Sequence, residues 1–149
     1  MIVPDVNLLV YAYNEAAPLH ALARDWWEGA LSKAQPIGVP WAVALGFVRI
    51  VTHPRVLDEP LLPGAALDRV EAWFARPEVR ILEPGPRHLP IVRALFEATG
   101  VAGALTTDTH IAALAIEHQC ELHSNDSDFS RYPGLRWRNP LSAAIASPR

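Results

Sequence analysis

Cysteine, long apolar runs and basic leader residues are scarce or missing in this sequence, and each scarcity excludes a class of protein. Cys120 is the one cysteine in 149 residues, which rules out an internal disulfide, and its apolar surroundings indicate a buried thiol. The longest apolar stretch, residues 39–48, is much shorter than the roughly 18 residues of a membrane-spanning helix. No basic segment precedes the first apolar residues, and Asp5 interrupts them at once, unlike a signal peptide. We therefore expect a soluble cytoplasmic protein without a membrane segment.

Fixed positive charge is also limited. Lys33 is the only lysine, and the formal net charge of the chain is -3. Binding to nucleic acid without regard to sequence needs clustered lysine and arginine side chains that displace counterions from the phosphates. The charge balance therefore excludes a general nucleic-acid coat protein, while it leaves room for a local nucleic-acid site.

What the sequence does contain is enough apolar material for one hydrophobic core. Half of the residues are apolar and 19% are charged, as in ordinary globular proteins. A chain of this length corresponds to about one domain. Because neither a linker nor an internal repeat interrupts it, we expect a single domain over residues 1–149.

Short strand-like runs alternate with longer helical ones, which indicates an α/β domain with a parallel sheet. We predict four to five short strands, at residues 1–3, 37–39, 79–82, 121–123 and 135–137. Helical periodicity or its end signals predict helices at residues 19–34, 41–52, 64–76, 87–99 and 105–118. The helix at 41–52 is nearly all apolar, so we expect it to be buried on most sides. The tail after Pro140 is expected to be a loose surface segment.

Three aspartates stand at the ends of these predicted elements. Asp5 follows the first strand, Asp126 follows a late strand, and Asp108 lies in the first turn of the helix before that strand. In an open parallel sheet, ligands gather at the carboxyl ends of the strands near the point where the strand order reverses. We therefore expect the three carboxylates to meet there.

Ionised carboxylates that lie close together repel one another, so such a cluster needs protons or a cation. Mg²⁺ or Mn²⁺ prefers oxygen ligands, and sites of this kind cleave phosphodiester bonds through water made acidic by the metal. The pattern thus predicts a metal-dependent nuclease. Taken singly, Asp5 or Asp108 at a helix start is also typical of a simple helix cap.

Three segments resemble the acidic motifs of PIN-domain proteins, and most closely those of the VapC-type toxins. The opening Ile-Val-Pro-Asp-Val-Asn-Leu-Leu at residues 2–9 resembles the first motif. Residues 107–115 resemble the third, and residues 124–129 resemble the fourth. With shorter matches at residues 47–56 and 132–141, the resemblance spans almost the whole chain.

This resemblance implies a three-layer α/β/α domain and the toxin of a toxin–antitoxin system. It also implies an endoribonuclease dependent on Mg²⁺ or Mn²⁺ that cuts RNA, often tRNA or rRNA. A small cognate antitoxin would neutralise the toxin, and homodimers are usual in the family. The catalytic and metal-binding residues carried over are Asp5, Asp108 and Asp126.

One position departs from the family pattern. The second acidic residue usually stands in the helix after the second strand, where this chain has Gly46. Asp128 is the candidate to replace this ligand. Ser124 matches the hydroxyl before the fourth acid and could orient water or phosphate, and Asn7 could either bond to Asp5 or cap the first helix.

Two other functions compete with this prediction. A phosphotransfer domain would also place aspartates around Mg²⁺, but it needs a lysine beside the phosphoryl group, and Lys33 ends a helix remote from the predicted site. A catalytically weakened PIN module, acting by RNA or antitoxin binding, would explain Gly46. Retention of Asp5, Asp108 and Asp126 favours the enzyme, because an idle cluster would carry unrelieved repulsion.

Overall fold

The computed structural model of the chain describes residues 1–142 and contains five strands and six α-helices in that part. The strands are β1 (Ile2–Pro4), β2 (Ile37–Pro40), β3 (Val79–Leu82), β4 (Glu121–His123) and β5 (Arg136–Arg138). The helices are α1 (Val6–Tyr13), α2 (His20–Ser32), α3 (Trp41–Val51), α4 (Pro63–Phe74), α5 (His88–Thr99) and α6 (Thr106–Glu117). Short 3₁₀ turns, η1 (Gly103–Leu105) and η2 (Ser127–Arg131), precede α6 and follow β4. The single domain expected over residues 1–149 stays a prediction, since residues 143–149 lie outside the described part.

The five strands form one parallel sheet in the order β3-β2-β1-β4-β5. The chain first moves from β1 through β2 to β3 at one edge, and then returns to place β4 and β5 on the other side of β1. The strand order therefore reverses between β1 and β4, which pair from Ile2–Glu121 to Pro4–His123. Crevices at such a reversal are the usual ligand sites of open α/β sheets.

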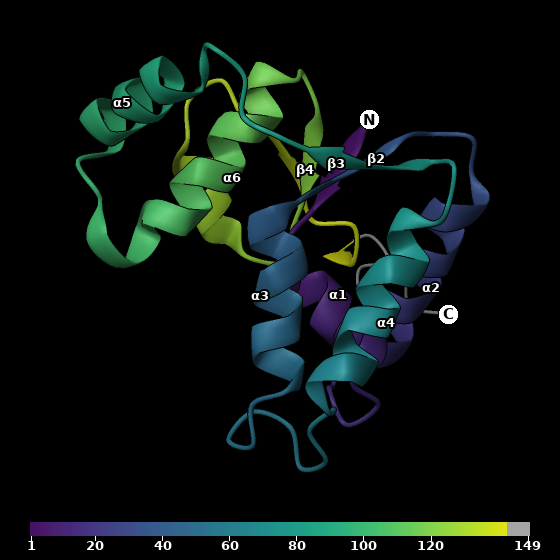
Figure 1. Cartoon of the computed structure of the whole chain (residues 1–149). Coiled ribbons are helices and arrows are strands. Elements are labelled where there is room, and N and C mark those ends of the chain that lie inside the picture. Colours follow the sequence, from purple (N-terminus) through teal and green to yellow (C-terminus); the bar gives the residue numbers. More distant parts are fainter. Residues whose placement is uncertain (143–149) are drawn as a thin grey trace.

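Helices cover both faces of the sheet, as the family resemblance implied. Crossovers between parallel strands are right-handed, so a change in the direction of travel changes the face that is covered. Accordingly α1 packs on α2 and α3, α3 packs on α4, and α5 packs on α6 as a separate group (Figure 1). The three-layer α/β/α architecture is confirmed.

Burial follows from this layering. Every residue of β1 and β2 is buried, whereas the edge strands β3 and β5 expose half or more of theirs. The expected burial of α3 on most sides is confirmed, since its exposed residues Trp41, Leu45 and Arg49 lie on one stripe and the others are buried or half-buried. One expectation was wrong, because Leu141 is buried against Leu8 and Ala23 instead of lying in a loose tail. The rest of that predicted tail, residues 143–149, lies outside the described residues.

The helices of the described part give no candidate for a membrane span, since none is long and apolar enough. The features that matter for the site are the ends of β1 and β4. Both strands stop at the reversal point, where β1 is followed directly by Asp5 and β4 is followed three residues later by Asp126.

Candidate functional site

Asp5 occupies the junction between β1 and α1 and is held from several sides. Its backbone N–H donates to the His123 carbonyl oxygen at the end of β4, at 2.9 Å. Its side chain caps α1 by accepting the Val6 N–H on Oδ1 at 2.8 Å, and it accepts the Ser124 hydroxyl on Oδ2 at 2.8 Å. Asp5 is therefore a helix cap and also a carboxylate fixed at the reversal point.

Asp5 as a whole residue is 3% exposed, and this burial is the largest influence on the pKa of its carboxyl group. Burial raises the pKa of Asp5 to about 6, the hydrogen bonds from Ser124 and Val6 oppose that rise, and the charges of Asp108 and Asp126 add to it. The three aspartates thus lie close enough for their charges to interact. At neutral pH Asp5 is mostly ionised, in a position where its charge is costly.

Asp108 enters the same region from the first turn of α6. Burial and the nearby carboxylates of Asp126 and Asp128 raise the pKa of Asp108, and the guanidinium of Arg131 lowers it. A carboxylate near a helix N-terminus gains from the helix dipole, which offsets part of this cost. The structure therefore brings Asp108 to the acidic group, as the spacing predicted.

Asp126 and Asp128 lie on the segment that follows β4. The Ser124 hydroxyl accepts the Asp126 N–H at 3.0 Å, and Asp126 Oδ1 accepts the Asp128 N–H at 2.9 Å. Ser124 is fully buried and so connects Asp5 directly to the turn that carries Asp126. Asp128 projects further out, with a side chain 60% exposed.

A buried hydrogen bond fixes Asp108 relative to this turn. Thr109, the neighbour of Asp108, shares a hydrogen bond of 3.0 Å with the hydroxyl of Tyr132, which follows η2. Both residues are almost completely buried. Sequence analysis missed this link, because nothing in the spacing pairs a threonine with a tyrosine 23 residues later.

Whether a divalent cation fits between these carboxylates depends on how closely they approach one another. Among residues 1–142, no three histidine, cysteine or acidic side chains are arranged to enclose an ion as they stand. Mg²⁺ commonly keeps several waters and contacts only one or two carboxylates directly. The donor set is all oxygen, and a cation would relieve the charge repulsion at Asp5. These residues therefore fit a hydrated cation, held partly through water, better than a closed cage of side chains.

Gly46 and Asn7 border the acidic group. A Cβ built on Gly46 would lie 3.3 Å from Cγ2 of Val6, the residue directly after Asp5, so position 46 faces the start of α1. Asn7 lies within α1 and is not its cap, a role that Asp5 fills. In the described part of the chain, no hydrogen bond joins the Asn7 side chain to Asp5. Its support of the site stays a prediction.

Comparison with known protein families identifies the family of this chain. The PIN domain matches residues 2–135, which is most of the chain. The chain belongs to the PIN-domain family. Within it, this PIN domain belongs with the VapC proteins. It is 43% identical over 141 residues to ribonuclease VapC33 of Mycobacterium tuberculosis, covering 95% of this chain and 99% of that relative.

A second relative, ribonuclease VapC37 of the same organism, is 38% identical over 140 residues, covering 94% of this chain and 97% of its own. Among solved structures, VapBC2 from Rickettsia felis, bound to a promoter DNA fragment, matches this PIN domain with a TM-score of 0.68. Identity there is 20%, over 93% of this chain and 98% of that one. VapC20 of M. tuberculosis, a toxin that cleaves the sarcin–ricin loop, matches with a TM-score of 0.65 at 15% identity, over 91% and 99%. Both structures support the fold.

A second network that sequence analysis missed holds β4 against α2. The Trp26 indole N–H donates to His123 Nδ1 at 3.1 Å, so the proton of a neutral His123 lies on Nε2 and faces Glu121 Oε1 at 2.7 Å. Burial lowers the pKa of His123, which favours that neutral form. Trp27 is buried, whereas Trp26 is only half-buried.

The cost of ionising Asp5 leads to a prediction for the metal-free PIN domain. The folded-state pKa of about 6 lies above the unfolded value near 3.8, so the free energy of unfolding falls as pH rises between these values. Asp5→Asn removes that cost. We expect the variant to be more stable than the wild type at pH above 6 by on the order of 2 kcal/mol, and the gain to vanish near pH 4. Urea unfolding in EDTA at the two pH values measures it.

The matched control is Asp25→Asn, on the exposed side of α2, where the aspartate only pairs with its neighbour Arg24. It should change stability little at either pH. If Asp5→Asn were less stable than the wild type at both pH values, the hydrogen bonds of Asp5 would outweigh its desolvation.

Proposed function

We propose that this chain is the toxin of a type II toxin–antitoxin system and cuts RNA as an endoribonuclease dependent on Mg²⁺ or Mn²⁺. The observation that carries the proposal is the buried Asp5 at the strand-order reversal. Burial and the charges of Asp108 and Asp126 raise the pKa of its carboxyl group. The relatives named as ribonucleases align with this chain over more than nine-tenths of its length, which supports the same activity here. The substrate proposed is RNA, with tRNA or rRNA as the candidate classes, and the cytoplasm is the proposed compartment.

Each side chain has a distinct task in this proposal. Asp5, Asp108 and Asp126 would hold the cation, and Asp128 would supply a further oxygen where Gly46 leaves a gap. When bound, the cation makes water more acidic and neutralises charge on the phosphodiester. Ser124 keeps Asp5 and the Asp126 turn in register through its two hydrogen bonds. Burial of Asp5 strengthens its attraction for the cation, because the surrounding dielectric is low.

The proposal predicts that the purified, antitoxin-free chain cuts bulk tRNA or rRNA when Mn²⁺ or Mg²⁺ is present. Asp5→Asn is expected to lower kcat/KM by at least about a hundredfold, because it removes charge from the cation site. Asp108→Asn should behave alike. Gel assays of end-labelled RNA, with and without EDTA, measure the loss.

Asp25→Asn is the control here too, because that surface carboxylate lies on α2 and outside the acidic group. Cleavage that persists unchanged in Asp5→Asn or in EDTA would mean that another site or a contaminant is responsible.

A catalytically weakened PIN module remains the second candidate, and Gly46 favours it. If the wild type binds RNA or antitoxin but does not cut, Gly46→Glu tests whether the missing acid is the cause. Gly46→Ala is its matched control, because it brings the same contact with Val6 without the carboxylate. Cleavage gained by Glu and not by Ala would assign the weakness to the missing ligand.

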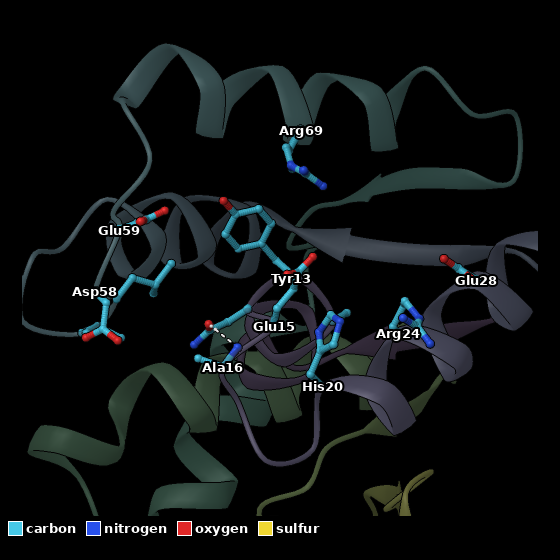
Figure 2. Close-up of a pocket in the computed structure, with 13 residues that line it drawn as sticks. Tyr13, Glu15, Ala16, His20, Arg24, Glu28, Asp58, Glu59 and Arg69 are labelled. Atoms are coloured by element: carbon cyan, nitrogen blue, oxygen red, sulfur yellow. Dashed lines mark hydrogen bonds between the residues drawn. The ribbon is translucent and has the colours of Figure 1, made fainter.

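A groove away from the acids is the proposed site for the antitoxin. It has a volume of about 700 Å³ and lies where the end of α1, α2, α4 and the loop before α4 meet (Figure 2). Tyr13 ends the eight-residue α1 that Asp5 caps, so the groove lies roughly 12 Å from Asp5. The solved VapBC structures pair a related fold with a second protein, which supports an antitoxin partner.

The charges of this groove indicate what its occupant carries. Glu15, Asp58 and Glu59 form no ion pair with residues of the described part, and neither does Arg69. The Arg69 guanidinium stands 4.6 Å from the centre of the Tyr13 ring, which fixes it in place. We propose an antitoxin segment with a basic side chain toward the three acids and an acidic one toward Arg69.

Arg69→Glu is expected to weaken the antitoxin complex about tenfold or more, because it places like charges across the contact. RNA cleavage by the free toxin should not change. Titration calorimetry with the proposed cognate antitoxin measures the affinity, and Arg93→Glu, on the exposed side of α5, is the control. If Arg69→Glu and Arg93→Glu bound the antitoxin with equal affinity, the antitoxin would bind outside this groove.

A homodimer is the remaining partner proposal. Trp41 and Leu45 lie one turn apart on α3, and both expose about half of their surface, which supports contact with a second copy. Leu45→Glu is expected to convert the dimer into a monomer in analytical ultracentrifugation. A wild-type monomer at all concentrations would contradict the proposal.

A further inference from the structure

The charge balance of the acidic group leaves a requirement that a cation alone does not meet. Asp5, Asp108, Asp126 and Asp128 together carry more negative charge than one divalent ion offsets. An RNA phosphodiester adds another negative charge at the same place. Binding RNA there therefore needs a fixed positive side chain close to the carboxylates.

Arg131 is the positive side chain that the structure places there. It ends η2, where its Nε donates to the Asp128 carbonyl oxygen at 3.0 Å and one terminal nitrogen lies 3.2 Å from Asp128 Oδ1. Its charge reaches Asp108, whose pKa it lowers. The guanidinium is therefore next to the acidic group and partly open to solvent, with 30% of the side chain exposed.

The geometry of Arg131 leaves donors free. A guanidinium has five N–H donors, and the two contacts with Asp128 use only part of them. The side chain is 30% exposed, so the remaining donors can meet a ligand without a change in the fold. A planar fork of donors matches two oxygens of a phosphate, which a lysine ammonium cannot do.

The pairing with Asp128 is also easy to exchange. Asp128 is 60% exposed, and an ion pair in contact with water contributes little. Movement of the guanidinium from Asp128 to a phosphate would release the Asp128 carboxylate. One movement would then supply a positive contact to the RNA and a free oxygen to the cation site.

We propose that Arg131 binds a phosphate of the RNA substrate at the acidic group, exchanging its contact with Asp128 for one with the phosphodiester. This inference rests on the proposed function, since it names the residue that brings RNA to that site. In this proposal Arg131 is a substrate-binding residue. In the absence of RNA, Asp128 holds the guanidinium of Arg131 in place.

RNA affinity without metal tests the proposal independently of cleavage. The probe is a short fluorescein-labelled single-stranded RNA of mixed sequence, titrated in EDTA at several salt concentrations. Arg131→Gln is expected to weaken binding about tenfold and to reduce the slope of log K against log salt by about 0.7, the loss of one phosphate contact. Arg131→Lys should keep the slope but only part of the affinity.

Asp128→Asn separates a phosphate contact from a structural role. If Arg131 only restrains Asp128, removing either partner of the pair would have the same effect on RNA affinity. We expect opposite effects, because Asp128→Asn removes a repelling charge and frees the guanidinium, so RNA binds more tightly. Arg93→Gln, an exposed arginine of α5, is the matched control and should leave affinity and slope unchanged.

Cleavage and metal binding complete the test. With Mn²⁺, Arg131→Gln should raise KM more than it lowers kcat, while Mn²⁺ affinity measured by calorimetry does not fall. Wild-type RNA affinity and slope in Arg131→Gln would overturn the inference. A wild type that binds RNA through Arg131 but never cuts it would instead overturn the proposed function.

Discussion

The ionised carboxylate of Asp5, buried at the point where the strand order reverses, is the constraint on which the rest of the site depends. A charge in that position is tolerated because the Val6 N–H and the Ser124 hydroxyl donate hydrogen bonds to the carboxylate. The backbone N–H of Asp5 donates to the His123 carbonyl oxygen and so ties the residue to the end of β4. Those bonds do not remove its cost, since burial still raises the pKa of Asp5 to about 6. A fold that retains such a group at a ligand crevice stores electrostatic strain that a cation can relieve.

The surrounding residues follow from this constraint. Ser124 fixes the distance between Asp5 and the Asp126 turn, and the buried Thr109–Tyr132 hydrogen bond fixes that turn against α6 and Asp108. Gly46 leaves the side of the site next to Val6 without a carboxylate. Arg131 and Asp128 lie outside this rigid part as a solvent-accessible ion pair. Exchanging the partner of either side chain there costs little free energy. In the proposed function, the rigid part would hold the cation and the exposed part would meet the substrate.

Much of the fold could be predicted from sequence because local patterns determine it. The alternation of short β-branched runs and amphipathic helices gave the strands within one or two residues, and Asp5, Asp108 and Asp126 were placed correctly at the ends of elements. Leu141 was misplaced in a loose tail, because its packing on Leu8 and Ala23 depends on tertiary contacts that the local pattern does not show. The links through Ser124, Thr109 and Tyr132 depend on tertiary distances that no spacing encodes.

The location of Mn²⁺ in crystals of the antitoxin-free chain tests the central claim most directly, since manganese is identified by its anomalous scattering. The account predicts one strong peak at the end of β1, in contact with a carboxylate oxygen of Asp5, Asp108 or Asp126 and linked to the others through water. A peak elsewhere on the surface, or none at this position at saturating Mn²⁺, would contradict it.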